Sequence, residues 1–207
     1  LKDISLEIPK GGRTVFLGEN GCGKTTLMRL IARLYKPTGG NITQYIDEKF
    51  KQKPKGSKAW YKKVGVVYQN PDYQLFMPTV RQEISFGAKS EEYAAEIAEL
   101  FGVKHLWERH PQSLSEGQKR RVSIAAVVAC APEVLLLDEP TVGQDYDGLC
   151  ALVEILNKLH IQSGNTMITI THDVRCAEAL CDRAYLIADG IVAKRGGKEL
   201  VREYFTS

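Results

Sequence analysis

Short apolar runs alternate with longer amphipathic stretches along most of the chain. A buried parallel strand is apolar on both faces, so continuous β-branched runs predict strands, and an apolar repeat near 3.6 residues predicts a helix. We expect strands at residues 3–8, 13–17, 64–68, 134–138, 166–171 and 183–188. We expect helices near residues 24–34, 79–87, 91–101, 116–129, 147–163, 174–180 and 198–205, with Gly or Pro at most junctions.

The order of these elements predicts an α/β fold. Strands that alternate with helices imply a mostly parallel sheet with helices on both faces. Residues from about 70 to 129 show helical patterns but no convincing strand, which predicts an all-helical insertion into the α/β core. The chain opens inside a strand pattern, LKDISLEIP, without a visible targeting segment, so we interpret the N-terminal strand region as truncated. We expect one domain over residues 1–207.

Composition narrows the class of protein. The 207 residues, 43% of them hydrophobic, suit a single globular domain with a sizeable core. The net charge of +3 is too small and too evenly spread to indicate a nucleic-acid partner. None of the five cysteines forms a CxxC pair, a pattern typical of a reducing cytosol.

Two stretches bear on a membrane role. The lysine-rich KFKQKPKGSKAWYKK at 49–63 is most simply an exposed loop or hairpin, and its alternative function is contact with anionic lipids. The most apolar stretch, VSIAAVVACAPEVLLLDEP at 122–140, is interrupted by Pro132 and Glu133 after about eleven residues, whereas a spanning helix needs ~20. If the protein serves a membrane, we expect it to do so from the water side.

The sequence GENGCGKTT at 18–26 has the residues of a glycine-rich phosphate loop, with a strand before it and an amphipathic helix after it. Its glycines let the backbone wrap phosphate oxygens, Lys24 can bridge the β- and γ-phosphates, and the Thr25 hydroxyl can ligate Mg²⁺. Cys22 beside Lys24 and the helix start favours a reactive thiolate, the alternative being a small residue that only fills the loop. The predicted phosphate-binding residues are Gly18, Glu19, Asn20, Gly21, Cys22, Gly23, Lys24, Thr25 and Thr26.

Four further residues lie at the ends of buried strands or just after them. Asp138 ends VLLLD at 134–138 and can hold Mg²⁺, and Glu139 beside it can orient an attacking water or, alternatively, only cap a turn before Pro140. Gln69 follows VGVVY and could reach the metal or the water, while His172 follows TMITIT and could contact a γ-phosphate as a neutral donor. Alone, such a glutamine or histidine is usually structural.

The stretch SLSEGQKRR at 113–121 places serine, glycine and glutamine at the start of a basic helix. The unpaired N–H groups of a helix N-terminus can bind phosphate, which predicts a second phosphate-binding site. The local residues fit equally well a helix capped by Ser115 whose basic side chains pack outward.

Together these motifs resemble the nucleotide-binding domain of ABC (ATP-binding cassette) ATPases over essentially the whole chain. The matching motifs are GENGCGKT, the Q-loop glutamine Gln69, the signature LSEGQ, the strand end LLLDE, the D-loop Asp145 and the switch His172. Within that family, QNPDYQLF at 69–76 followed by PTVRQEISFG is similar to cassettes of energy-coupling-factor (ECF) importers, which transport cobalt, nickel and vitamins in prokaryotes.

The resemblance implies a P-loop NTPase core with a small antiparallel N-terminal β part and Mg²⁺-dependent ATP hydrolysis. It also implies a head-to-tail dimer in which the signature of one cassette caps the γ-phosphate bound by the other, with Lys119, Arg120 and Arg121 adding positive potential nearby. Its partners would be a second cassette, identical or not, and transmembrane subunits at the cytoplasmic face of the membrane, without nucleic acid. The implied roles are catalytic for Lys24, Gln69, Glu139 and His172, metal-binding for Thr25, Gln69 and Asp138, and partner-facing for Ser115, Glu116, Gly117, Gln118 and Asp145.

Two other functions are alternatives to this one. A soluble ABC ATPase of DNA repair, ribosome or protein remodelling would carry a long coiled-coil insertion or a tandem cassette, and these 207 residues contain neither. A regulatory module without turnover is disfavoured because Glu139 and His172 are both present.

The chain departs from the family pattern at three points. Glu116 stands where the family more often has glycine, which brings negative charge near a triphosphate. The D-loop reads VGQD in place of the commoner SGLD, which predicts altered communication between the two sites. The aromatic residue that stacks on adenine normally lies upstream of the first strand, so no residue is assigned that role.

Overall fold

The computed structural model describes residues 1–47, 50–52 and 60–206. Its strands are β1 (Arg13–Leu17), β2 (Gln44–Asp47), β3 (Phe50–Gln52), β4 (Val64–Val67), β5 (Val134–Asp138), β6 (Thr166–Ile170), β7 (Arg183–Ala188) and β8 (Ile191–Gly196). Its α-helices are α1 (Lys24–Ile31), α3 (Val80–Ser85), α4 (Glu91–Leu100), α5 (Glu116–Ala129), α6 (Tyr146–Ser163), α7 (Val174–Ala179) and α8 (Lys198–Thr206). Short 3-10 helices cover Pro71–Tyr73, Lys104–Leu106 and Pro111–Ser113.

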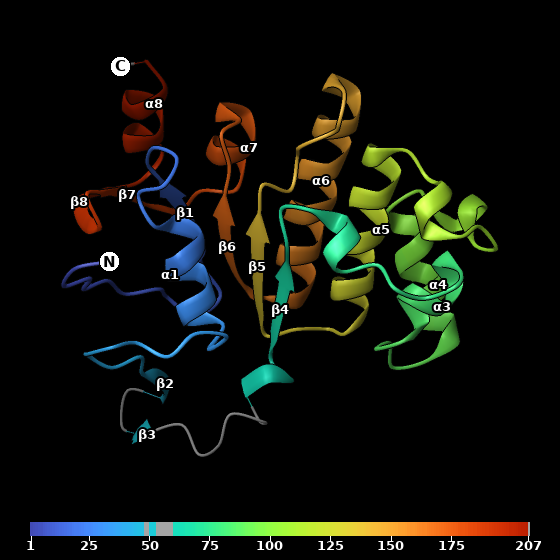
Figure 1. Ribbon diagram of the computed structural model, residues 1–207, viewed down its shortest axis with the longest axis horizontal. Helices are drawn as coiled ribbons and strands as arrows, with labels where there is room; N and C mark the ends of the chain where they lie inside the picture. The colour runs from blue at the N-terminus through green and yellow to red at the C-terminus, as the bar shows by residue number, and fades with distance from the viewer. Residues whose placement is uncertain (48–49, 53–59, 207) are drawn as a thin grey trace.

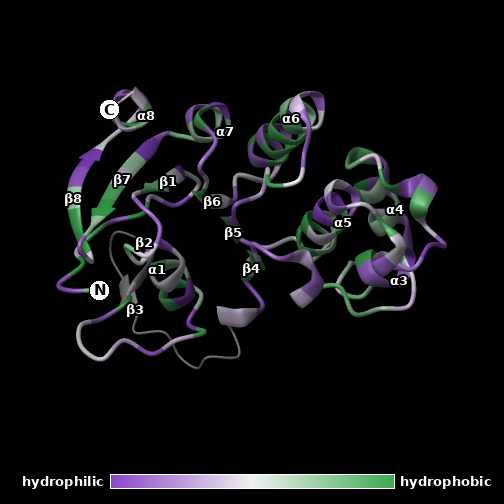
Figure 2. Cartoon of the chain, turned by 45° about the horizontal axis from the view of Figure 1, so that its top comes forward, coloured by the Kyte–Doolittle hydropathy of each residue, from purple (hydrophilic) through white to green (hydrophobic). Residues whose placement is uncertain are grey.

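Six strands form one sheet in the order β4-β5-β6-β1-β7-β8, and β2 pairs with β3 in a separate two-stranded antiparallel sheet. All neighbours in the large sheet are parallel except β7 and β8, which confirms the predicted mostly parallel sheet. Strand β8 is absent from the expected elements, because this edge strand is largely exposed and turns from hydrophobic to hydrophilic along its length (Figure 2). Charged residues are typical of edge strands, where they discourage pairing with other chains.

Helices cover both faces of the sheet (Figure 1). Successive side chains of a strand point to opposite faces, and β1 shows the consequence. Phe16 lies in the hydrophobic cluster that contains Met28 of α1, whereas Leu17 lies in the cluster that contains Val201 of α8. The apolar run 15–17 of β1 thus reflects burial on both sides, as expected for a central parallel strand.

Residues 70 to 129 contain only helices, as predicted for the insertion. Val80 of α3, Ile97 of α4 and Ile124 of α5 are buried in one cluster with Leu135 and Leu137 of β5. The helical part therefore shares its core with the sheet. It lies beyond the β4 edge of the sheet in Figure 1.

The strand expected at residues 3–8 is wrong, because residues 1–12 contain no strand. Side chains bond the backbone there: the Tyr185 hydroxyl donates to the Glu7 carbonyl at 2.6 Å, and Arg195 donates to the Ser5 carbonyl at 2.6 Å. The alternating apolar residues Ile4, Leu6 and Ile8 still pack on the core near α1. The alternation therefore reflects one buried face rather than strand pairing.

The lysine-rich segment at 49–63 falls largely outside the described residues. Its described part includes β3, which pairs with β2 (Gln44–Asp47) outside this segment, so the interpretation of 49–63 as a loop or hairpin stays a prediction. Trp60 is buried instead of exposed, and its indole N–H donates to the Ile31 carbonyl at 3.1 Å. Within the described parts of the chain, no helix combines the length and apolar character needed to cross a bilayer.

Candidate nucleotide-binding and hydrolysis site

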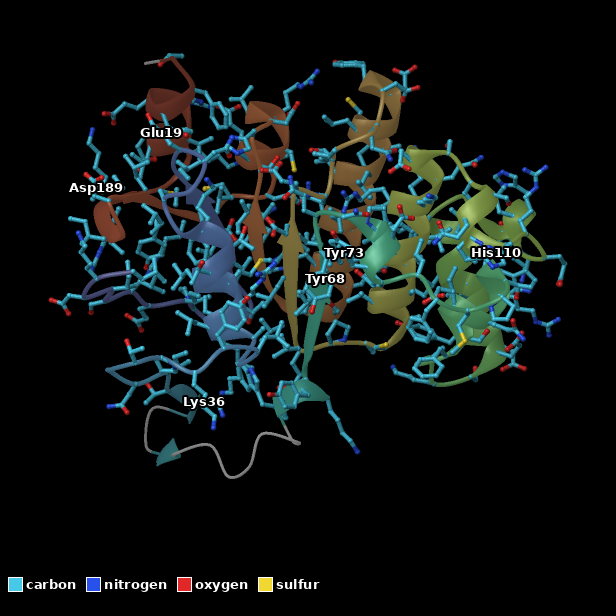
Figure 3. All side chains as sticks on the ribbon, viewed as in Figure 1. Glu19, Lys36, Tyr68, Tyr73, His110 and Asp189 are labelled. Atoms are coloured by element: carbon cyan, nitrogen blue, oxygen red, sulfur yellow. The ribbon has the colours of Figure 1, made fainter. Side chains whose placement is uncertain are left out.

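The phosphate loop connects β1 to α1 at the carboxyl edge of the sheet, where Glu19 is labelled in Figure 3. Gly18 has a φ of 141°, and a Cβ there would lie 2.2 Å from the Ile187 carbonyl oxygen of the neighbouring strand. Only glycine fits this position, so the tight turn is set by both backbone conformation and close packing.

Lys24, the first residue of α1, is buried and turned back onto its own loop. Its ammonium donates to the carbonyl oxygens of Gly18 at 2.6 Å and Glu19 at 2.8 Å, and lies 3.9 Å from the Cys22 sulfur. The charge is therefore held inside the loop, where an entering phosphate would compete with those carbonyl oxygens for it.

Thr25 and Asp138 meet beside the loop. The Thr25 hydroxyl donates to the Asp138 carboxylate at 3.1 Å, which joins the start of α1 to the end of β5. Burial raises the pKa of Asp138, opposed by the Thr25 hydrogen bond and the charges of Arg29 and Lys24. Among the described residues, no group of three or more His, Cys, Asp or Glu side chains could hold a metal ion. Mg²⁺ in nucleotide sites commonly takes one or two protein oxygens plus substrate phosphates, so this pair still fits the ion.

Glu139 follows Asp138 in a left-handed conformation, with a φ of 51°. Such backbone costs about 1–3 kcal/mol for a residue other than glycine and occurs often at functional sites. The Glu139 N–H donates to the Ile170 carbonyl at 2.8 Å, and the carboxylate accepts from the His172 N–H at 3.1 Å. Burial raises the pKa of Glu139, an effect that His172 opposes. Glu139 is thus held by the end of β6 and is more than a turn cap.

His172 links Glu139 to the phosphate loop. Its Nε2 lies 3.0 Å from the amide oxygen of Asn20 and 3.5 Å from the Glu139 carboxylate. Both neighbours are acceptors, so Nε2 carries the proton in this arrangement. Parallel pairing of β5 and β6 aligns Asp138 with Ile170, which brings Glu139 and His172 together from distant parts of the sequence.

Gln69 lies two residues beyond β4, at the same edge of the sheet. Its side chain is exposed, and its carbonyl accepts a hydrogen bond from Arg120 of α5. Tyr68 and Tyr73, labelled in Figure 3, mark this connection between β4 and α3. The second guanidinium nitrogen of Arg120 donates to the Tyr68 carbonyl at 2.6 Å.

The basic residues after the signature do not all face outward. Lys119 and Arg120 are 7% and 2% exposed, and Lys119 pairs with Asp72 at 2.9 Å. Burial lowers the pKa of Arg120, and the hydrogen bond with Asp72 raises the pKa of Lys119. Outward packing is wrong for these two residues, because their side chains tie α5 to the segment after β4. The positive potential that they would add toward a partner's phosphate stays a prediction.

The signature and the D-loop lie together, apart from the phosphate loop. Ser115 caps α5: its hydroxyl accepts from the Gln118 N–H at 3.4 Å, and the Gln118 side chain accepts from the Ser115 N–H at 3.1 Å. Asp145 caps α6 through the Gly148 N–H at 2.8 Å. Glu116 is exposed and lies 3.5 Å from Lys119, which offsets part of its charge. A cavity of about 410 Å³ is lined by both motifs and by no described residue of the phosphate loop.

Two residues that connect the motifs, Arg120 and Gln144, have no such role among the sequence expectations. In the sequence, Arg120 stands out only as one of the basic residues after the signature, and Gln144 only as part of the D-loop VGQD, which departs from the family pattern. Neither an arginine nor a glutamine in a sequence indicates such a hydrogen bond, because the bond depends on which carbonyl the fold brings within reach of the side chain.

Known proteins resemble this chain over most of its length. The family described as ABC transporter matches residues 1–142. The energy-coupling factor transporter ATP-binding protein EcfA2 of Lactococcus lactis is 39% identical over 206 residues, which cover 95% of this chain and 71% of that protein. Its namesake from Bacillus thuringiensis is 39% identical over 213 residues, covering 97% and 72%.

Solved structures agree. The cbiO1 protein of Clostridium perfringens, part of the ABC transporter complex cbiONQ, superimposes with a TM-score of 0.83 at 34% identity and covers 100% of this chain and 85% of that one. A dimeric post-hydrolysis state of the ATP-binding cassette MJ0796, bound to ADP and Pi, gives a TM-score of 0.81 at 28% identity and covers 96% and 90%. The chain therefore belongs to the ABC transporter family, as one of its ATP-binding cassettes.

Proposed function

We propose that this cassette hydrolyses ATP to drive an ECF-type importer of a metal ion or a vitamin. The observation that carries the proposal is the hydrogen-bonded set of Asn20, His172 and Glu139 beside Lys24 at one edge of the sheet. The EcfA2 relatives and the cbiO1 structure support the importer class. We take residues 1–207 as one ATPase domain whose helical subdomain covers about 70–129.

Glu139 is our candidate for the residue that positions the attacking water. Its carboxylate is held by the His172 N–H and is buried, so it is oriented before substrate arrives. A buried carboxylate with a raised pKa is a better proton acceptor than an exposed one. The water oxygen then bonds to the γ-phosphorus as the bond from that phosphorus to the β–γ bridging oxygen breaks and ADP leaves. Glu139 accepts a proton from the water.

Lys24 and His172 supply charge and a hydrogen-bond donor where the phosphoryl group passes. Charge spreads over the equatorial oxygens in such transfers, and fixed donors stabilise it without reorganisation. The His172 Nε2–H, now shared between Asn20 and Glu139, would turn toward the γ-phosphate.

Mg²⁺ is the cofactor that these residues fit. The Thr25 hydroxyl and the Asp138 carboxylate, 3.1 Å apart, would supply protein oxygens, and Gln69 at the same edge would add a third. When bound, the ion would neutralise charge on the β- and γ-phosphate oxygens.

A second cassette, identical or not, would complete each site. Within one chain, the signature residues Ser115 to Gln118 lie with the D-loop and not with the phosphate loop. The N-terminus of an α-helix suits a phosphate supplied from outside the chain, because its dipole favours negative charge there. The dimeric MJ0796 cassette, bound to ADP and Pi, supports this assembly.

Transmembrane subunits would dock near Gln69, so that the cassette associates peripherally with the cytoplasmic face of the membrane. Tyr73, Phe76 and Phe86 are 82%, 69% and 68% exposed, and the rings of Phe76 and Phe86 pack edge to face at 5.6 Å. Buried Glu83 holds this loop by accepting from the N–H groups of Phe76 and Met77. Exposed aromatic clusters on ordered backbone are typical of protein interfaces.

The test is purification of the tagged chain from membranes of its host, followed by mass spectrometry of bound proteins. We expect a cassette partner and integral membrane proteins in stoichiometric amounts. Recovery with DNA-repair proteins or ribosomes, and without membrane proteins, would show that the importer assignment is wrong.

A further inference from the structure

The D-loop residue Gln144 uses both ends of its amide on the signature helix. Its nitrogen donates to the Gly117 carbonyl at 2.9 Å, and its oxygen accepts from the Arg121 side chain at 3.0 Å. The two partners are one turn apart on α5, so a single side chain spans the first turn of the helix.

The backbones are also in close contact at this point. A Cβ on Gly117 would lie 2.9 Å from the Gly143 carbonyl oxygen and 3.1 Å from the Gln144 amide nitrogen. Any larger residue at 117 would push the D-loop away from the helix. Gly117 therefore serves this contact inside the chain as well as the signature motif.

The other end of the D-loop is anchored too. Asp145 caps α6 by accepting from the Gly148 N–H at 2.8 Å. The short loop is thus bonded to α5 through Gln144 and to α6 through Asp145, with Arg121 reaching from one helix to the loop. Leucine, the commoner family residue at 144, could make neither hydrogen bond.

We propose that Gln144 is a positioning residue that joins the D-loop to the signature helix, so that Ser115 and Asp145 meet the second cassette as one rigid unit. The inference rests on the proposed ATP-bound dimer. A preformed unit loses less conformational freedom on association, so Gln144 should favour dimer formation. ATP binding by the chain's own phosphate loop does not depend on it.

The test compares Gln144→Leu with Gln162→Leu, a matched change at an exposed position of α6, both in a Glu139→Gln background that retains ATP. We expect Gln144→Leu to raise the ATP concentration for half-maximal dimerisation roughly tenfold, the scale of one or two lost hydrogen bonds. Affinity of the monomer for ATP should stay unchanged, and Gln162→Leu should behave as the parent. Hydrogen exchange of the nucleotide-free monomer should quicken at 116–118 and 142–145 in Gln144→Leu alone.

The outcomes separate this inference from the dimer proposal. If the parent dimerises and Gln144→Leu does so at the same ATP concentration, the positioning role is wrong. Loss of ATP affinity in the monomer would also overturn it, because the effect would then not lie in assembly. If the parent forms no dimer, alone or with a second cassette, the proposed dimer fails, and hydrogen exchange alone decides whether Gln144 joins the two segments: unchanged exchange overturns the inference.

Discussion

The Glu139 carboxylate accepts a hydrogen bond from the backbone N–H of His172 at 3.1 Å. The two residues follow adjacent parallel strands, β5 and β6, and each is placed by the end of its strand. A backbone donor cannot be removed by substitution of His172, so the orientation of Glu139 should persist when that side chain is changed. The roles of the two residues can therefore be tested separately.

Replacing Glu139 with Gln should preserve ATP binding and lower the hydrolysis rate by roughly 10²-fold or more, because the amide cannot accept the water proton. Steady-state phosphate release and binding of a fluorescent ATP analogue measure the two effects. Glu154→Gln, at an exposed position of α6, is the matched control. Hydrolysis by Glu139→Gln at the parental rate would remove Glu139 from the mechanism.

The same substitution should alter stability in a pH-dependent way. Burial raises the pKa of Glu139 in the folded chain, so the folded state binds the proton more tightly than the unfolded state. The charged side chain therefore costs stability above the folded pKa, and this cost fades as the pH falls through that pKa. We expect Glu139→Gln to melt at a higher temperature than the parent at pH 7, with a smaller gap at pH 4. A gap that widens in acid would contradict the cause given for the pKa shift.

Cys22 should react fastest among the five cysteines with a thiol reagent, and Mg-ATP should protect it. It is partly exposed and lies 3.9 Å from the Lys24 ammonium, whereas Cys176 and Cys181 are buried. Burial raises the pKa of Cys176 to about 12 and of Cys181 to about 11, which suppresses their thiolates. Mass spectrometry after brief alkylation locates the label. Equal labelling of Cys22 with and without Mg-ATP would count against its place at the phosphates.

Mixing two inactive variants should restore part of the activity if the sites are shared between chains. Lys24→Ala removes the positive charge that would contact the ATP bound by the same chain. Ser115→Arg blocks the contact of the signature with the ATP bound by the partner. A mixed dimer then holds one doubly damaged site and one intact site, formed by the phosphate loop of the second variant and the signature of the first. ATPase assays of the mixture and of each variant alone decide the matter.

The mixing experiment depends on homodimer formation, which is checked first by ATP-dependent dimerisation of Glu139→Gln on a sizing column. Given such dimers, a mixture no more active than the separate variants would leave shared sites unsupported or require both sites to act together.

The sequence by itself determined the fold class, the helical insertion and most of the residues that we propose for hydrolysis. Strands such as β5 are read correctly because their apolar residues are buried on both faces whatever lies next to them. The phosphate loop is equally local, since its glycines, Lys24 and Thr25 act within one turn between a strand and a helix. These features depend on residues close together in the sequence.

The tertiary structure alone decided which polar groups meet. Residues 3–8 have the alternation of a strand, yet the Tyr185 hydroxyl and Arg195 bond their carbonyls, from more than 170 positions away. In the sequence, Arg120 cannot be told from an exposed basic residue. Only the path of the chain after β4 brings the Tyr68 and Gln69 carbonyls within hydrogen-bonding distance of its side chain. Gln144 bonds α5 for the same reason. A polar side chain bonds to whichever partner the fold places within about 3 Å, and the local sequence does not determine which partner that is.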